Sequence, residues 1–190
     1  VITNTVKRMS EGELLQISKT RKLDIDEETY FRIISDKTAS LLSTCCEVGA
    51  RASTDDEQKI TALKEFGENL GIAFQIRDDI LDFIGTKNIF GKSLGADIKE
   101  KKITLPLIYA LKNAPQEESK KIINLLKSKE RKTKVDVVIK FVKMYEGIEY
   151  SEKIALEYSK AALSKLEQFQ TSESRLSLKS LVSFVVERKN

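Results

Sequence analysis

One stretch of the sequence, Leu70–Ile84, constrains the fold more than any other, because it is apolar on nearly every face of a helix and yet carries three aspartates. A helix that is apolar all round belongs in a protein interior. Asp78 and Asp82 are four residues apart and share one helical face, with Asp79 beside them and Gln75 one turn earlier. Because unpaired carboxylates are costly to bury together, we expect a cation to lie among them.

The composition favours an all-α protein. The 190 residues include only 8 Gly and 2 Pro, whereas Leu, Ile, Ala, Lys and Glu are abundant. Apolar residues also recur at helical spacing late in the chain, as in Val135–Val142 and Leu178–Val185. No internal repeat or composition shift marks a boundary, so residues 1–190 are predicted to form a single domain or part of a larger one.

Charge, cysteine content and hydropathy exclude several classes of protein. The net charge of +4 is too small to indicate nucleic-acid binding, and no aromatic residues alternate with the basic ones. The sequence contains no histidine, which excludes a histidine metal site, and the adjacent Cys45 and Cys46 match no zinc-binding spacing. Neither a signal peptide nor an apolar run of about 20 residues is found. We therefore expect a cytoplasmic protein without a transmembrane segment.

The predicted helices give several polar residues definite positions. Asp24 or Asp26 can cap a helix that has Lys37–Thr38 in its middle. Thr54–Glu57 has the form of a capping box and opens the long central helix. The residues that follow this helix, 85–102, hold three glycines and many charges. A long irregular segment of this kind is often functional.

An aspartate cluster followed by a lysine-containing loop suggests magnesium and a phosphorylated ligand. Mg2+ prefers oxygen ligands and commonly bridges one or two carboxylates to substrate phosphates. Lys92 and Lys102 lie in the segment after the central helix, where their ammonium groups could bind the same phosphates. The Asp-Asp-x-x-Asp spacing also occurs by chance on solvated acidic helices. The residues alone therefore leave a metal-phosphate site and a solvated acidic face as alternatives.

Several motifs, in order along the chain, resemble those of trans-polyprenyl diphosphate synthases. They are Gly12–Gln16, Asp36–Leu41, Gly71–Asp82, Gly91–Lys92, Gly95–Ile98, Lys101–Leu107 and Val186–Lys189. The resemblance covers the whole chain and is nearest to bacterial medium- and long-chain members such as octaprenyl diphosphate synthase. It implies an all-α isoprenoid-synthase bundle around a central cavity. It also implies prenyl transfer, in which an allylic diphosphate ionises, condenses with isopentenyl diphosphate and loses a proton.

The resemblance also implies a metal site. Asp78 would bind Mg2+ directly, while Asp79 and Asp82 would hold metal-bound water or lysine partners. Asp97 matches a family position near the metal waters.

Further residues are implied to contact or line the substrates: Lys37, Thr38, Phe74, Gln75, Lys92 and Lys102. The three lysines would bind the allylic diphosphate, Thr38 and Gln75 would face the developing allylic cation, and Phe74 would line the cavity. Lys37, Thr38 and Gln75 are thus the residues implied to act in catalysis. The basic pair Arg188 and Lys189 would approach isopentenyl diphosphate.

One departure from the family pattern concerns its first aspartate-rich motif, which has no counterpart here. Residues 1–18 also look like a helix without a start signal. We therefore expect the chain to be the C-terminal part of a synthase, incomplete at the N-terminus and inactive alone. The expected partners are the two diphosphate substrates and a second copy in a homodimer, with peripheral membrane contact for long products and no nucleic acid.

Two other functions stay open. A non-catalytic helical partner subunit would explain the missing motif. Another class I terpenoid enzyme, such as a cyclase, would share the metal-diphosphate chemistry, although Lys37–Thr38 and Gly91–Lys92 argue against it.

Overall fold

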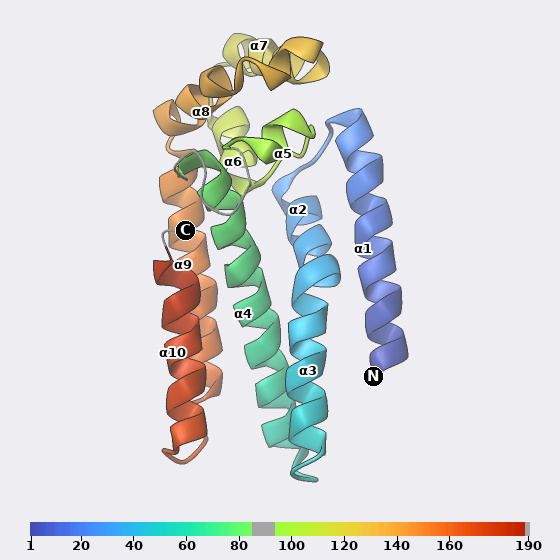
Figure 1. Cartoon of the computed structure of the whole chain (residues 1–190), viewed down its shortest axis with the longest axis vertical. Helices are drawn as coiled ribbons and strands as arrows, with labels where there is room; N and C mark the ends of the chain where they lie inside the picture. The colour runs from blue at the N-terminus through green and yellow to red at the C-terminus, as the bar shows by residue number, and fades with distance from the viewer. Residues whose placement is uncertain (85–93, 189–190) are drawn as a thin grey trace.

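In the computed structural model, which describes residues 1–84 and 94–188, every regular element is a helix, as predicted. The elements are α1 (Ile2–Lys22), α2 (Glu27–Ile34), η1 (Ser35–Ala39), α3 (Ser40–Arg51), α4 (Glu57–Ile84), α5 (Ala96–Lys99), α6 (Leu105–Asn113), α7 (Gln116–Lys127), η2 (Lys129–Lys132), α8 (Val135–Met144), α9 (Gly147–Lys165) and α10 (Glu173–Glu187). Figure 1 shows α1, α2–α3, α4, α9 and α10 side by side along the long axis, with α5–α8 gathered at one end.

Helix α4 is the interior helix that the sequence predicts. Its Phe66, Ala73, Ile76 and Ile80 are each at most 1% exposed, and it packs between α3 on one side and α9 on the other. At about 25 cal/mol per Å² of apolar surface, burial of such a helix is a main source of stability. The three aspartates thus belong to an interior helix, and Asp79 is the one that is fully buried.

Two helix starts follow from local capping. Asp26, and not Asp24, caps α2, because its carboxylate accepts a hydrogen bond from the backbone N–H of Thr29 at 2.8 Å. The predicted capping box beginning at Thr54 is wrong. The carboxylate of Asp56 instead accepts from the backbone N–H groups of Gln58 and Lys59, so α4 begins at Glu57.

The predicted helix around Lys37–Thr38 is interrupted by one π-helical turn, η1. The backbone N–H of Ser40 donates to the carbonyl of Ser35, five residues earlier, which is the π-helical pattern. The expected irregular segment 85–102 also contains the short helix α5, while residues 85–93 lie outside the described part of the chain.

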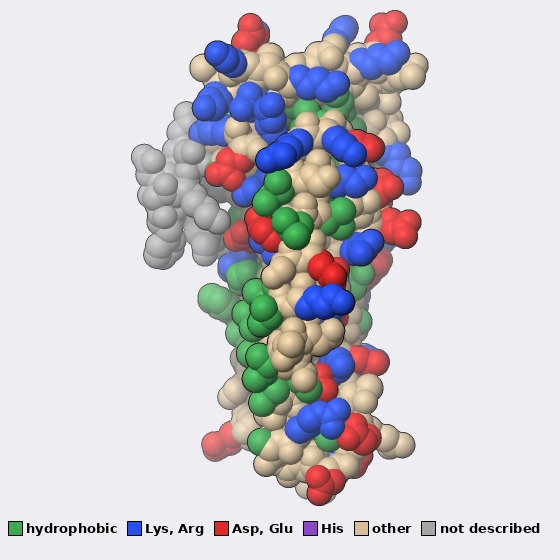
Figure 2. All heavy atoms as spheres, turned by 90° about the vertical axis from the view of Figure 1, so that its right-hand side faces the viewer, with side chains coloured by type: hydrophobic (Ala, Val, Ile, Leu, Met, Phe, Trp, Pro, Cys, Tyr) green, Lys and Arg blue, Asp and Glu red, His purple; other side chains and the backbone are tan. Residues whose placement is uncertain are grey.

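Helix α1 joins the bundle through one narrow face. Its buried residues are Thr5 and Gly12. Figure 2, which views the molecule from the right-hand side of Figure 1, shows apolar side chains in a line down one edge of the surface. The exposed large apolar residues of α1 and α3 are Ile2, Val6, Leu14, Ile17, Leu41 and Val48.

Across residues 1–84 and 94–188, no helix has both the length and the apolar character to cross a membrane.

Candidate active site

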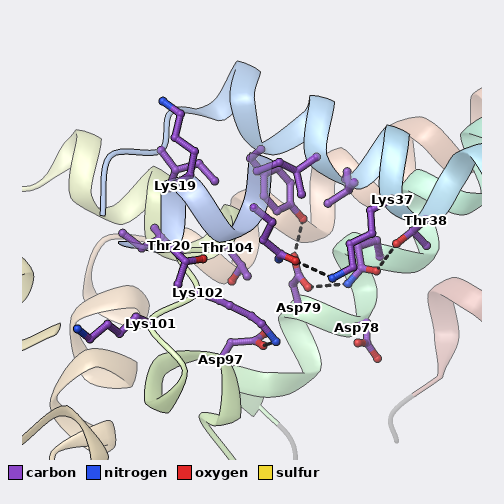
Figure 3. Close-up of a pocket in the computed structure, with 17 residues that line it drawn as sticks. Lys19, Thr20, Lys37, Thr38, Asp78, Asp79, Asp97, Lys101, Lys102 and Thr104 are labelled. Carbon is purple, nitrogen blue, oxygen red and sulfur yellow. Dashed lines mark hydrogen bonds and ion pairs between the residues drawn. The ribbon is translucent and has the colours of Figure 1, made fainter. Parts of the chain in front are cut away.

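A pocket lies between α1, the consecutive helices α2 and η1, α4, and the segment that begins at α5 (Figure 3). Its polar lining residues are Gln16, Lys19, Thr20, Tyr30, Lys37, Thr38, Gln75, Asp78, Asp79, Asp97, Lys101, Lys102 and Thr104. The structure therefore brings together most of the predicted site residues from three separate parts of the chain.

Asp79 is the buried centre of a hydrogen-bond chain in this pocket. Its carboxylate, 4% exposed, accepts from the Tyr30 hydroxyl at 2.7 Å and from the Gln75 amide Nε2 at 2.9 Å. The Thr38 hydroxyl donates to Oε1 of Gln75 at 2.9 Å, which extends the chain to η1. Burial, together with the charge of Asp97, raises the pKa of Asp79 to about 8 against the opposing effect of its hydrogen bonds. Asp79 thus fixes the orientation of Gln75 and Thr38.

The other two aspartates of the motif have different surroundings. Asp78 has a side chain that is 40% exposed, and it forms an ion pair with Arg188 at 3.3 Å. The Asp82 carboxylate accepts from the backbone N–H groups of Ala96 at 2.9 Å and Asp97 at 3.0 Å, so it holds the start of α5. Within residues 1–84 and 94–188, no three acidic or cysteine side chains lie close enough to hold a metal ion by themselves. The metal roles of the three aspartates stay predictions.

Lys37 reaches from η1 toward α1. Its ammonium group contacts Oε2 of Glu13 and Oε1 of Gln16, each at 2.6 Å. Gln16 also lines the wall of the pocket.

Lys102 approaches the pocket from the segment after α5. Its ammonium group lies 2.6 Å from Glu100 and 3.6 Å from Asp97, and Figure 3 shows it directed at Asp97. Burial opposes the charged form, but the two carboxylates outweigh burial and raise the pKa of Lys102. This lysine therefore stays protonated at neutral pH. Lys92, the third predicted lysine, lies outside the described residues.

The end of the chain returns to α4 close to the motif. The Arg188 guanidinium lies 4.4 Å from the centre of the Phe74 ring, and Arg77 donates two hydrogen bonds, of 3.0 and 2.7 Å, to the Arg188 carbonyl. Phe74 packs against a buried cluster that includes Phe66, Leu70 and Val185, and it is not among the residues lining the pocket of Asp79. Its predicted place beside the substrate stays a prediction, and Lys189 lies outside the described residues.

The expected cation lies beside Asp78, one of the three aspartates of the motif. Arg188 pairs with Asp78, and Lys102 lies beside Asp97. Sequence reasoning assigned no role to Tyr30, although a tyrosine on an otherwise apolar helical stripe was the available signal. A buried tyrosine hydroxyl needs a hydrogen-bond partner, and here that partner is Asp79.

Comparison with known proteins shows which family has a similar sequence. The sequence model of the family described as "Polyprenyl synthetase" matches residues 1–144. The short chain isoprenyl diphosphate synthase of Methanothermobacter thermautotrophicus is 33% identical over 190 residues, covering 100% of this chain and 58% of the relative. The octaprenyl diphosphate synthase of Escherichia coli is 30% identical over 190 residues, covering 99% of this chain and 58% of the relative.

A solved structure agrees with these relatives. The polyprenyl synthase from Caulobacter crescentus CB15, complexed with calcium and isoprenyl diphosphate, matches with a TM-score of 0.92 at 29% identity, covering 100% of this chain and 58% of that protein. The chain thus spans 58% of the length of each of these three proteins. Sequence and fold agree with the resemblance drawn from the motifs, and the chain belongs to the polyprenyl synthetase family.

Proposed function

We propose that the protein containing this chain joins isopentenyl diphosphate to an allylic diphosphate and so lengthens a trans-polyprenyl diphosphate. The C–O bond of the allylic diphosphate breaks, and diphosphate leaves with the bonding electrons. A C–C bond then forms to isopentenyl diphosphate, and a proton is lost. The observation that carries the proposal is one pocket in which Lys37 and Lys102 accompany Asp78, Asp79 and Asp97, in a chain of this family.

Lys37 and Lys102 are proposed to bind the allylic diphosphate. The leaving group gains negative charge as the C–O bond breaks, so nearby ammonium groups stabilise the transition state more than the ground state. Carboxylates from Glu13 and Glu100 already hold the two ammonium groups at the pocket, which supports this role. Lys92 is proposed to act with them.

Thr38 and Gln75 are proposed to face the allylic cation. The Gln75 amide is held at both ends, by the Thr38 hydroxyl and by Asp79. Oxygen dipoles held in place on a pocket wall stabilise developing positive charge without reorganising during the reaction. Phe74 is proposed to lie along the substrate cavity.

Mg2+ is the proposed cofactor, with Asp78 as its direct ligand and Asp79 and Asp82 acting through bound water. Carboxylate oxygens suit this ion. Burial raises the pKa of Asp79 most, and the nearby charges of Asp97 and Asp78 add to it, so a cation at this place would offset crowded negative charge. When bound, the metal would neutralise charge on the leaving diphosphate. The relative from Caulobacter crescentus is complexed with another divalent cation, calcium.

The test uses radiolabelled isopentenyl diphosphate with farnesyl diphosphate and Mg2+, followed by extraction of product into organic solvent. We expect labelled product from the protein that contains this chain, and a large loss with Asp78→Asn. Lys165→Met, which alters an ion pair with Glu65 on the scaffold, is the matched control and should leave turnover unchanged. Absence of product from folded protein supplied with both substrates and metal would refute the proposal.

The same assay separates the alternative functions. Labelled product formed when radiolabelled farnesyl diphosphate is supplied alone would indicate a cyclase. Stimulation of a separate catalytic subunit, without turnover of its own, would indicate a partner subunit. The homodimer, the cytoplasmic location and peripheral membrane contact for long products stay predictions.

A further inference from the structure

Two of the proposed catalytic residues, Lys37 and Thr38, lie on the π-helical turn η1 and not on regular α-helix. Single π-turns within α-helices are rare and frequent at functional sites. Here the turn directs neighbouring side chains to different helices. Lys37 contacts Gln16 on α1, while Thr38 donates to Gln75 on α4. The conformation of η1 therefore determines whether both residues reach the pocket.

Two glycines hold η1 closely between α1 and α4. A Cβ added to Gly12 would lie 2.9 Å from the Lys37 backbone nitrogen, and one added to Gly71 would lie 2.5 Å from the Ala39 Cα. Such close approach fixes the position of the η1 backbone from two sides. Close packing does not by itself explain why η1 adopts π-helical hydrogen bonds, from N–H to a carbonyl five residues earlier, in place of α-helical ones. Further contacts must hold the backbone in this conformation.

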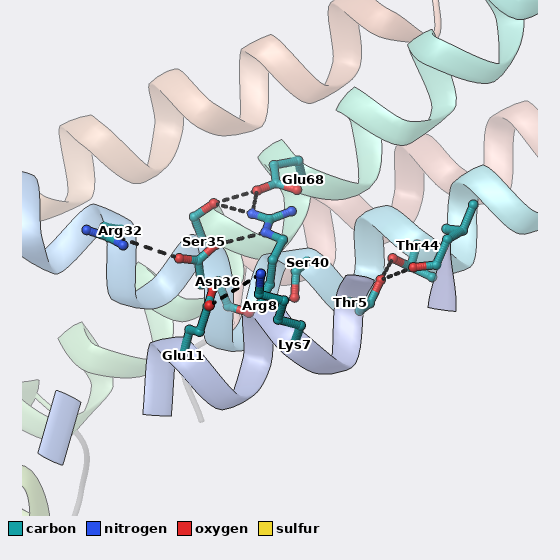
Figure 4. A network of polar contacts seen from close by, with 11 residues as sticks. Thr5, Lys7, Arg8, Glu11, Arg32, Ser35, Asp36, Ser40, Thr44 and Glu68 are labelled. Atoms are coloured by element: carbon teal, nitrogen blue, oxygen red, sulfur yellow. Dashed lines mark hydrogen bonds and ion pairs between the residues drawn. The ribbon is translucent and has the colours of Figure 1, made fainter. Parts of the chain in front are cut away.

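Arg8 on α1 supplies that support (Figure 4). Its Nε donates to Oδ1 of Asp36 at 2.8 Å, and its Nη2 donates to the Ser35 hydroxyl at 3.0 Å and to Oε1 of Glu68 at 2.9 Å. The Ser35 hydroxyl donates in turn to the same Glu68 oxygen at 2.5 Å. One guanidinium thus ties the first two residues of η1 to both neighbouring helices.

Removing this guanidinium would leave Glu68 without its cation, and would leave Asp36 with only the exposed Arg32, whose Nε lies 3.9 Å away. The side chains of Asp36 and Glu68 are only 19% and 25% exposed, so water compensates them poorly. Charged groups left unpaired in such a setting destabilise the arrangement that holds them there. The least costly relief is a local rearrangement of η1 that moves Asp36 toward solvent and carries Lys37 with it.

We propose that Arg8 is a positioning residue, whose guanidinium holds η1 in its π-turn so that Lys37 and Thr38 face the pocket. The inference rests on the proposed function, because it assigns Arg8 an effect on the binding of allylic diphosphate. Arg8 lines no part of the pocket itself and acts through η1.

The test compares Arg8→Met with Arg51→Met in the protein that contains this chain. Arg51 is a matched control, since it also bridges two carboxylates, Glu47 and Glu57, but at the far end of α3 from η1. Arg8→Lys keeps the charge without the forked geometry and should have an intermediate effect. If Arg8→Met does not fold, Arg8→Lys alone carries the comparison.

Two readouts distinguish positioning from general stability. Amide hydrogen exchange of residues 35–41 should accelerate in Arg8→Met and not in Arg51→Met. The KM for the allylic diphosphate should rise and kcat should fall by about tenfold or more, as small misplacements of positioning groups do. The KM for isopentenyl diphosphate should stay within about twofold of wild type, whereas partial unfolding would lower kcat and leave both KM values unchanged.

The outcomes separate the two proposals. Wild-type exchange at residues 35–41, or a wild-type KM for the allylic diphosphate, in a folded Arg8 variant of an active enzyme would overturn the inference. Equal effects in Arg51→Met would also overturn it. A wild-type protein without turnover would instead refute the proposed function, and hydrogen exchange would still decide whether Arg8 holds η1.

Discussion

Gly71→Ala should destabilise the protein, although alanine is the better helix former. Gly71 lies inside α4, where replacing glycine by alanine ordinarily stabilises a helix by about 0.5–1 kcal/mol. Here the added Cβ would lie 2.5 Å from the Ala39 Cα and 2.8 Å from its Cβ. Because Ala39 belongs to the η1 backbone, no flexible side chain can move aside. Overpacking of this kind costs about 1–3 kcal/mol, so the clash outweighs the gain in helix propensity.

Urea denaturation of the protein that contains this chain measures the effect. With a loss of about 2 kcal/mol and a denaturant slope of about 2 kcal/mol per molar, the unfolding midpoint should fall by about 1 M. Gly49→Ala in α3 is the matched control, because an added Cβ there meets no atom within 4 Å. The control should be as stable as wild type or more stable. Equal stabilisation by both substitutions would refute the close approach of η1 to α4.

Three further predictions concern charge. Lys37→Met and Lys102→Met should each raise the KM for the allylic diphosphate and lower kcat by about tenfold or more. Steady-state kinetics with varied allylic substrate measure both effects, and unchanged KM and kcat values would indicate a scaffold role for these lysines. Asp78→Asn should lower turnover by about tenfold or more and raise the Mg2+ concentration for half-maximal rate, and an unchanged Mg2+ titration would contradict its role as a metal ligand. Burial opposes ionisation of Glu68, but hydrogen bonds from Arg8 and other groups outweigh it and lower the Glu68 pKa. The ionised Glu68 should therefore contribute fully to stability above the pKa of an unfolded glutamate, about 4.3, and this contribution should be lost as the pH falls through the lower pKa of the folded state. Glu68→Gln should flatten the pH dependence of urea stability in that range. An unchanged profile would contradict the lowered pKa of Glu68.

Much of the scaffold could be predicted because it depends on local pattern. The apolar run of α4 indicates an interior helix, and Ile76 and Ile80 are fully buried. The sequence predicts a cap for α2 at Asp24 or Asp26, and the structure has it at Asp26. The grouping of Lys37, Thr38 and Gln75 in one pocket followed from the resemblance to the family, but their contacts did not.

The features that could not be predicted depend on contacts between distant segments. The π-turn of η1 has no signal in its own five residues, because Gly12, Gly71 and Arg8 on other helices support it. The ion pair of Asp78 and Arg188 joins residues 110 positions apart. The contact of Asp82 with α5 requires the backbone to turn at Gly95, whose φ of 71° lies in the left-handed region that favours glycine.

The Asp-Asp-x-x-Asp spacing serves the fold as well as the proposed chemistry. Adjacent residues on a helix lie about 100° apart, so Asp78 reaches the exposed edge of the pocket while Asp79 turns into the core toward Tyr30. Asp82, one turn further, reaches the backbone of α5. One motif thus orients a pocket wall, anchors the following segment and keeps one carboxylate accessible. A variant that spares Asp78 but removes Asp79 or Asp82 should therefore lose stability together with activity, whereas Asp78→Asn should lose activity alone.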